Sequence, residues 1–130
     1  MLRQLRRERG QDLIEFALIL PILALLLFGI MEFGIIMFSH NTIADAAREG
    51  ARYGAVHCPS WSTTCNLTDI STETKKLMRG LKQDAGHLTV TPTHPTGTIR
   101  VEVQYKVDVI TFIVGSPSIT LRAVSTMQTE

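Results

Sequence analysis

The sequence predicts an α+β protein with one long N-terminal helix and a small head made of a second helix and an antiparallel sheet. Two observations carry this prediction. Residues 16–38 form an almost unbroken apolar run, and residues 99–109 alternate apolar and polar side chains. The first pattern is typical of a helix that crosses a membrane, and the second of a strand with one buried face. Between them, apolar positions recur at intervals of three and four, which indicates an amphipathic helix.

The apolar run from Phe16 to Phe38 is long enough to span a bilayer. Its 23 residues give about 34 Å of helix, against a hydrocarbon core of roughly 30 Å. Pro21 and Glu32 are its main interruptions. If Glu15 marks one boundary of the membrane, Glu32 falls near the other, where an interfacial charge and a polar contact to a partner helix both fit.

Charge is distributed unevenly along the chain. Arg3, Arg6, Arg7 and Arg9 precede Gly10, whereas the remaining residues include nine basic and eleven acidic side chains. The sequence therefore lacks the basic patch that nucleic-acid binding requires. A short cationic flank before a first apolar helix stays in the cytoplasm. We predict that residues 1–10 are a basic cytoplasmic leader and that the long C-terminal part is exported.

A cleaved secretory signal peptide is an alternative interpretation of the N-terminus. Such a peptide has an apolar region of about 7–15 residues followed by a small-residue cleavage site. Residues 44–46 match that site pattern, but they lie well beyond a longer apolar run. We favour a helix that is retained. A cut immediately after Gly10 would keep it, and would make Gln11 the first residue and Glu15 the fifth.

The helix is predicted to continue beyond the membrane, so that residues 11–56 form a transmembrane helix and an exported stalk. Residues 39–56 are rich in alanine and contain no proline. One face of this segment carries small side chains, which let another backbone approach closely. We expect residues of this segment to contact a partner helix. The candidates are Ala46, Ala47, Arg48, Glu49, Gly50, Ala51 and Arg52.

Three stretches in a consistent order, GQDLIEFALILP, LLLFGIMEFG and AAREGARYGA, resemble the TadE-like family. This family comprises pilin-related proteins of tight-adherence (Flp) pilus systems. The resemblance implies a pilin-like minor pilin or pseudopilin that a prepilin peptidase cuts between Gly10 and Gln11. It also implies partnership with a major Flp pilin and a second pseudopilin, and indirectly with an inner-membrane platform and a secretion ATPase.

The resemblance assigns Glu15, followed by Phe16, to assembly. In pilin-like assemblies this acid pairs with the free amine of a neighbouring subunit, which neutralises both groups. A carboxylate at the edge of an apolar helix is costly to bury without such a partner. The alternative is an interfacial Glu15 that lies among lipid headgroups and complements the positive end of the helix dipole.

Residues 57–130 are predicted to form the exported head, which begins with a disulfide. Cys58 and Cys65 are the only cysteines. An exported location is oxidising, so we expect them to be bonded to each other. Trp61 lies between them and either contacts a partner or covers the core.

A second helix is predicted over Ser71–Ala85, with Ser71 as its N-cap and Gly86 as its stop. Its apolar positions are Thr74, Leu77, Met78, Leu81 and Ala85. Its basic residues form a face that is either solvated or in contact with anionic lipid, and solvation is favoured.

Three strands are predicted after this helix. The clearest spans residues 99–109, where Ile99, Val101 and every second residue up to Val109 are apolar. A shorter strand at residues 88–90 precedes a turn region at residues 92–97. Another at residues 119–123 follows a turn at residues 115–117. Connections this short favour a three-stranded antiparallel sheet.

No catalytic constellation is evident in the sequence. The four histidines are scattered, and His57 beside Cys58 lacks a third catalytic partner. We therefore expect a protein that is not an enzyme and binds no metal or cofactor. The favoured interpretation is a pilus-assembly subunit in the bacterial inner membrane, from which it can be extracted into a pilus. The alternative is an uncleaved single-pass envelope protein with an accessory or binding role outside any filament.

Overall fold

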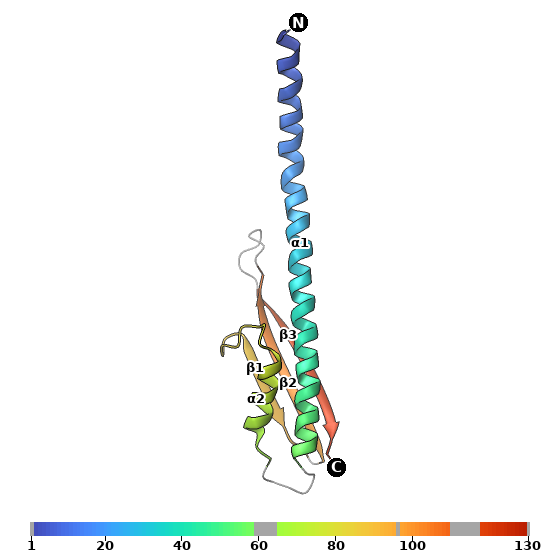
Figure 1. Cartoon of the computed structure of the whole chain (residues 1–130), viewed down its shortest axis with the longest axis vertical. Helices are drawn as coiled ribbons and strands as arrows, with labels where there is room; N and C mark the ends of the chain where they lie inside the picture. The colour runs from blue at the N-terminus through green and yellow to red at the C-terminus, as the bar shows by residue number, and fades with distance from the viewer. Residues whose placement is uncertain (1, 59–64, 96, 110–117, 130) are drawn as a thin grey trace. The chain divides into compact units, whose positions relative to one another are not determined.

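A computed structural model of the chain confirms the predicted α+β fold (Figure 1). It describes residues 2–58, 65–95, 97–109 and 118–129. The elements are the helices α1 (Leu2–His57) and α2 (Leu67–Leu77) and the strands β1 (Leu88–Thr93), β2 (Thr98–Asp108) and β3 (Ser118–Gln128). The chain divides into two compact units, Met1–Gly34 and Ile35–Glu130.

In the unit Met1–Gly34, the described residues form the first part of α1. Leucine, isoleucine and alanine dominate it, and these residues support a helix whose backbone groups are satisfied internally. Pro21 lies inside the helix. From Gly10 onward almost every side chain of this unit is exposed. Ile22, for example, is 70% exposed and Phe16 is 60% exposed.

In the unit Ile35–Glu130, the three strands form an antiparallel sheet in the order β1-β2-β3. The predicted alternation along β2 is confirmed. Ile99, Val101 and Val103 are fully buried, while their even-numbered neighbours lie on the opposite, polar face of the sheet. β2 pairs with β3 over eleven residue pairs without a slip in register. The buried alternation of β2 thus places the core on one face of the sheet.

The outer strands are longer than predicted. β1 continues through Pro92 to Thr93, where we expected a turn region to begin. Proline is tolerated there because β1 is an edge strand with a partner on one side only. β3 extends from Ser118 to Gln128, well past the predicted end at Ala123. The predicted turn at residues 115–117 lies outside the described residues.

The second helix was predicted too late in the sequence. Its N-cap is Asn66, not Ser71, and the helix ends at Leu77 instead of Ala85. The Asn66 side chain accepts a hydrogen bond from the Thr68 N–H at 3.2 Å and donates one to Asp69 at 2.9 Å. This cap satisfies a backbone donor that a helix start leaves free, so the helix begins here.

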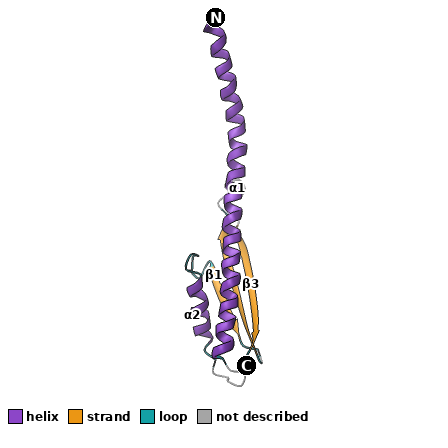
Figure 2. Cartoon of the chain, turned by 45° about the vertical axis from the view of Figure 1, so that its right-hand side comes forward, coloured by secondary structure: helices purple, strands orange, loops and turns teal. Residues whose placement is uncertain are grey.

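Both helices of this unit cover the same face of the sheet, with α2 beside the C-terminal part of α1 (Figure 2). The core between the helices and the sheet is formed by small α1 residues and larger residues from α2 and the strands. Met78 and Thr74 are fully buried as predicted, whereas Leu77 is 47% exposed. The buried apolar residues are Ile43, Ala46, Ala47, Ala51, Cys58, Ile70, Met78, Leu88, Ile99, Val101, Val103, Tyr105, Val107 and Ala123.

Candidate functional site

The apolar segment of α1 is the first feature with functional potential. Most of its large side chains between Leu13 and Phe38 are exposed, and the helix is long and apolar enough to cross a membrane. Exposure of so many apolar side chains to water is unfavourable, at roughly 25 cal/mol per Å². This helix fits a single-pass membrane protein, in which lipid or other apolar helices surround it.

The residues predicted for processing and assembly lie at the start of this segment. Gly10, Gln11, Glu15 and Phe16 are all helical and exposed. A side chain added at Gly10 would meet nothing within 4 Å. Glu32, further along the same helix, is half-buried. The structure therefore leaves Glu15 accessible to a partner, and its role in assembly stays a prediction.

The small-residue face of α1 is covered by the chain's own head. Ala46, Ala47 and Ala51 are at most 1% exposed. A Cβ atom placed on Gly50 would lie 2.1 Å from Oγ1 of Thr74 in α2, and Gly50 is itself buried. These residues let α2 and the sheet approach α1 closely, which is the use that small side chains serve at helix contacts.

The charged residues of the same segment point away from this core. Arg48 and Arg52 are exposed, and Glu49 is half-buried. Arg52 donates two hydrogen bonds to the Glu49 carboxylate, at 2.9 and 2.6 Å. Arg48 lies 3.4 Å from Asp45. Exposed ion pairs of this kind contribute little to stability, because water and salt screen them. Their structural value is small, so Arg48, Glu49 and Arg52 are the part of the segment that stays available for the predicted contact with a partner.

A groove lies along this charged face, between α1 and α2. Its volume is about 490 Å³, and Gly50 lies in its wall. Glu73 on α2 forms an ion pair with Lys76 one turn later, as Glu49 does with Arg52 on α1. The groove is therefore bordered by charges that are paired within their own helices. The lining residues are Asp45, Arg48, Glu49, Gly50, Tyr53, Glu73 and Leu77.

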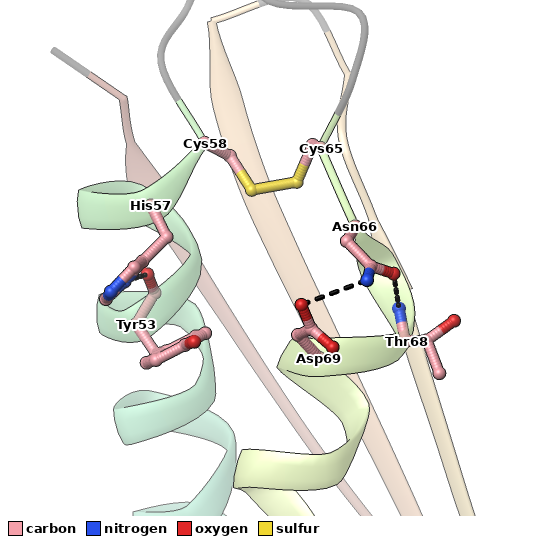
Figure 3. Close-up of a disulfide and its surroundings, with 7 residues drawn as sticks. All are labelled: Tyr53, His57, Cys58, Cys65, Asn66, Thr68 and Asp69. Atoms are coloured by element: carbon pink, nitrogen blue, oxygen red, sulfur yellow. Dashed lines mark hydrogen bonds between the residues drawn. A yellow bond between two sulfur atoms is a disulfide. The ribbon is translucent and has the colours of Figure 1, made fainter.

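The predicted disulfide between Cys58 and Cys65 is confirmed (Figure 3). It joins the residue after α1 to the residue before Asn66, the N-cap of α2. Beside it, the rings of Tyr53 and His57 stack with their centroids 4.0 Å apart. The disulfide thus links the end of α1 to the start of α2. Trp61, for which we weighed a core or partner role, lies outside the described residues.

Sequence reasoning missed several groups that the fold brings together. The groove is lined in part by Tyr53, Glu73 and Leu77. Tyr53 is distant in sequence from the other two residues, and Leu77 was predicted to face the core. His87 contacts Asp84 and Asp108, while the histidines were expected to be scattered. The register of β1 against β2, which the sequence pattern alone does not specify, creates this cluster.

Comparison with known families found a match between residues 10–52 and the model of the TadE-like protein family. The resemblance expected from the sequence is thus confirmed over about a third of the chain. The matched segment contains the apolar helix, Glu15 and the residues up to Arg52. Comparison with curated proteins and with solved structures found no match.

Proposed function

We propose that this chain, which carries a TadE-like segment at residues 10–52, is a minor pilin or pseudopilin that acts in the assembly of a tight-adherence (Flp-type) pilus. The observation that carries the proposal is the exposed apolar helix with an acid near its start. Between Leu13 and Phe38 most of its large side chains are exposed in the part of the chain that the structure describes, and Ile36 is the one that packs partly against the core. Such a helix is stable in lipid, and it can also pack laterally in a bundle of similar helices.

The proposed topology places the N-terminus in the cytoplasm and the head on the exported side of the inner membrane. The four arginines before Gly10 support this orientation through the positive-inside rule. The Cys58–Cys65 disulfide supports it independently, because disulfides persist in oxidising compartments.

Assembly is proposed to proceed by lateral packing of pilin-like helices. A prepilin peptidase removes residues 1–10, and the new amine at Gln11 and the Glu15 carboxylate become available to neighbouring subunits. Pairing of a carboxylate with an amine offsets part of the cost of placing the two charges in an apolar bundle, whereas either charge left there alone would be strongly destabilising. The partners proposed from the family are a major Flp pilin and a second pseudopilin, acting with the inner-membrane platform and the secretion ATPase. The charged face at Arg48, Glu49 and Arg52 is proposed as a further contact outside the membrane.

Replacement of Glu15 by alanine tests this proposal. We expect Glu15→Ala to insert into the membrane like the wild type, because alanine is more favourable in an apolar helix. We expect it to lose most pilus output and most co-purification with pilin-like partners. Insertion is measured by membrane fractionation, output by counting pili, and partner capture by affinity purification after cross-linking.

Asp12→Ala provides the matched control, because it removes another exposed acid from the same helix. The proposal predicts that this variant assembles normally. Normal pilus output from Glu15→Ala would contradict an assembly role for that acid, and would favour an envelope accessory protein that never enters a filament.

A further inference from the structure

His87 lies between two carboxylates that come from different parts of the head. Its Nδ1 atom is 2.8 Å from Oδ2 of Asp84, and its Nε2 atom is 3.0 Å from Oδ2 of Asp108. Asp84 belongs to the turn between α2 and β1, and Asp108 is the last residue of β2. The imidazole therefore bridges the turn and the strand end. Because the carboxylates approach opposite ring nitrogens, they are not arranged to hold one metal ion with this histidine.

The geometry requires a proton on each ring nitrogen. A neutral imidazole has one N–H donor, whereas an ionised carboxylate only accepts hydrogen bonds. Two acceptors at 2.8 and 3.0 Å are both satisfied only by the imidazolium form. Loss of one proton would remove a donor from one of the carboxylates and leave two negative charges beside a neutral ring.

Backbone hydrogen bonds place this cluster at a junction of the fold. The N–H groups of His87 and Leu88 donate to the Asp84 carbonyl, both at 3.0 Å. The Lys106 N–H of β2 donates to the His87 carbonyl at 2.8 Å. These bonds close the turn and start the pairing of β1 with β2. A change at the His87 ring is therefore coupled to amides whose exchange with solvent can be measured.

The charges around the cluster are few. Lys82, in the same turn, lies 3.7 Å from Asp108. The hydrogen bond from His87 is the main cause of the lowered pKa of Asp108, and the charges of Lys82 and of Lys106 on β2 lower it further. On β3, uncharged Ser118 is opposite Asp108. Arg122, the charged residue of β3, is paired with Glu102 at 2.8 Å. Residues 110–117, which follow the strand, contain no ionisable side chain.

We propose that Asp84, His87 and Asp108 form a proton-dependent clamp that fastens the turn between α2 and β1 to the end of β2. The clamp is closed while the imidazolium holds both carboxylates, and it releases the turn when the ring loses its proton. Its direct consequence is a head whose local stability around residues 84–88 falls as the pH rises above about 6.5.

The direction of this dependence follows from the pKa shifts. Hydrogen bonds to Asp108 and then to Asp84 raise the pKa of His87 above its ordinary value of 6.5. The clamp therefore stabilises the head fully below about pH 6.5 and loses this contribution as pH rises through the higher pKa of the folded state.

The two aspartates set the lower pH limit of the clamp. Hydrogen bonds to His87 lower the pKa of both aspartates. Their contribution is present above about pH 4 and is lost as pH falls through their lowered values. The clamp is strongest between these two limits.

Hydrogen exchange of the full chain in detergent micelles tests the clamp. Protection factors are measured for the amides of His87, Leu88 and Lys106 between about pH 5.5 and about pH 9, after division by the intrinsic exchange rates. In the wild type we expect protection to fall several-fold across this range, with a midpoint above pH 6.5. In His87→Gln we expect low protection without this transition.

His40→Gln is the matched control, because it removes an exposed histidine that lies on α1. It is expected to keep the wild-type transition. Asp108→Asn is expected to move the midpoint to lower pH, since it removes one of the two charges that favour the imidazolium. Wild-type protection that does not change with pH, or an unchanged transition in His87→Gln, would overturn the proposal.

If His87→Gln does not fold, NMR titration of the wild-type His87 ring decides the matter. A His87 midpoint at or below about 6.5 overturns the clamp, and a higher midpoint that coincides with the loss of protection supports it.

Discussion

Substitution of Gly50 by alanine is expected to destabilise the head by about 1–3 kcal/mol through overpacking. Alanine at a helical position normally stabilises a helix by about 1 kcal/mol relative to glycine. Here the added Cβ atom would lie 2.1 Å from Oγ1 and 3.2 Å from Cβ of Thr74. Thr74 is fully buried, and its hydroxyl donates to the Ile70 carbonyl at 2.7 Å. The overlap is therefore expected to outweigh the gain in helix propensity. Denaturant unfolding of the full chain in micelles, followed by tryptophan fluorescence, measures the difference.

Gly34→Ala serves as the control for the effect of alanine itself, because a Cβ atom at Gly34 meets nothing within 4 Å. It is expected to leave the unfolding of the head unchanged. The double substitution Gly50→Ala with Thr74→Ala removes the clashing hydroxyl and should recover part of the lost stability. A Gly50→Ala protein as stable as the wild type would show that α2 does not pack against α1 as described.

Removal of the disulfide by Cys58→Ala with Cys65→Ala is expected to cost about 2–3 kcal/mol in the chain-entropy model. The bond closes a short loop, with a sequence separation of 7 residues. It also holds the N-cap of α2 near the end of α1, so its loss should loosen α2 before the sheet. The same unfolding measurement gives the total cost, and hydrogen exchange of the α2 amides locates it.

Reduction of the wild-type protein separates the effect of the cross-link from that of the substitutions. Cys58 is buried, so its replacement by alanine also removes packing contacts. Reduced wild type is therefore expected to be at least as stable as the double variant and less stable than the oxidised wild type. Equal stability of the oxidised and reduced wild type would contradict a stabilising role for this disulfide.

The elements with a strong sequence period were predictable, and those that depend on local capping were not. β2 was placed within one residue, because burial of one sheet face forces strict alternation from Ile99 onward. The start of α2 was missed because Asn66 directly follows a cysteine of the disulfide loop, and the threonines after it are weak helix formers. The end of α2 was missed because Leu81 fits the apolar period of the helix. Leu81 is half-buried against the core, but it lies in the bend that follows α2.

The candidate site was predictable in part for a similar reason. The apolar helix and the family segment are properties of contiguous sequence, and both were found. Which element packs against a small-residue face depends on the tertiary structure. The stretch from Ala46 to Ala51 was equally compatible with a partner helix and with the chain's own core, and the structure buries its alanines and Gly50 in the core. The His87 cluster depends on residues 84, 87 and 108, whose proximity only the strand register creates.

The mature N-terminus is the most direct test of the proposed pilin-like role. Intact-mass and N-terminal peptide spectrometry of the protein, purified from the membranes of cells with an active prepilin peptidase, identifies the first residue. Cells that lack the peptidase provide the control and should yield a chain with its leader intact. Processing between Gly10 and Gln11 predicts a mature chain that begins at Gln11. A chain that still begins at Met1 in the presence of the active peptidase would contradict the account.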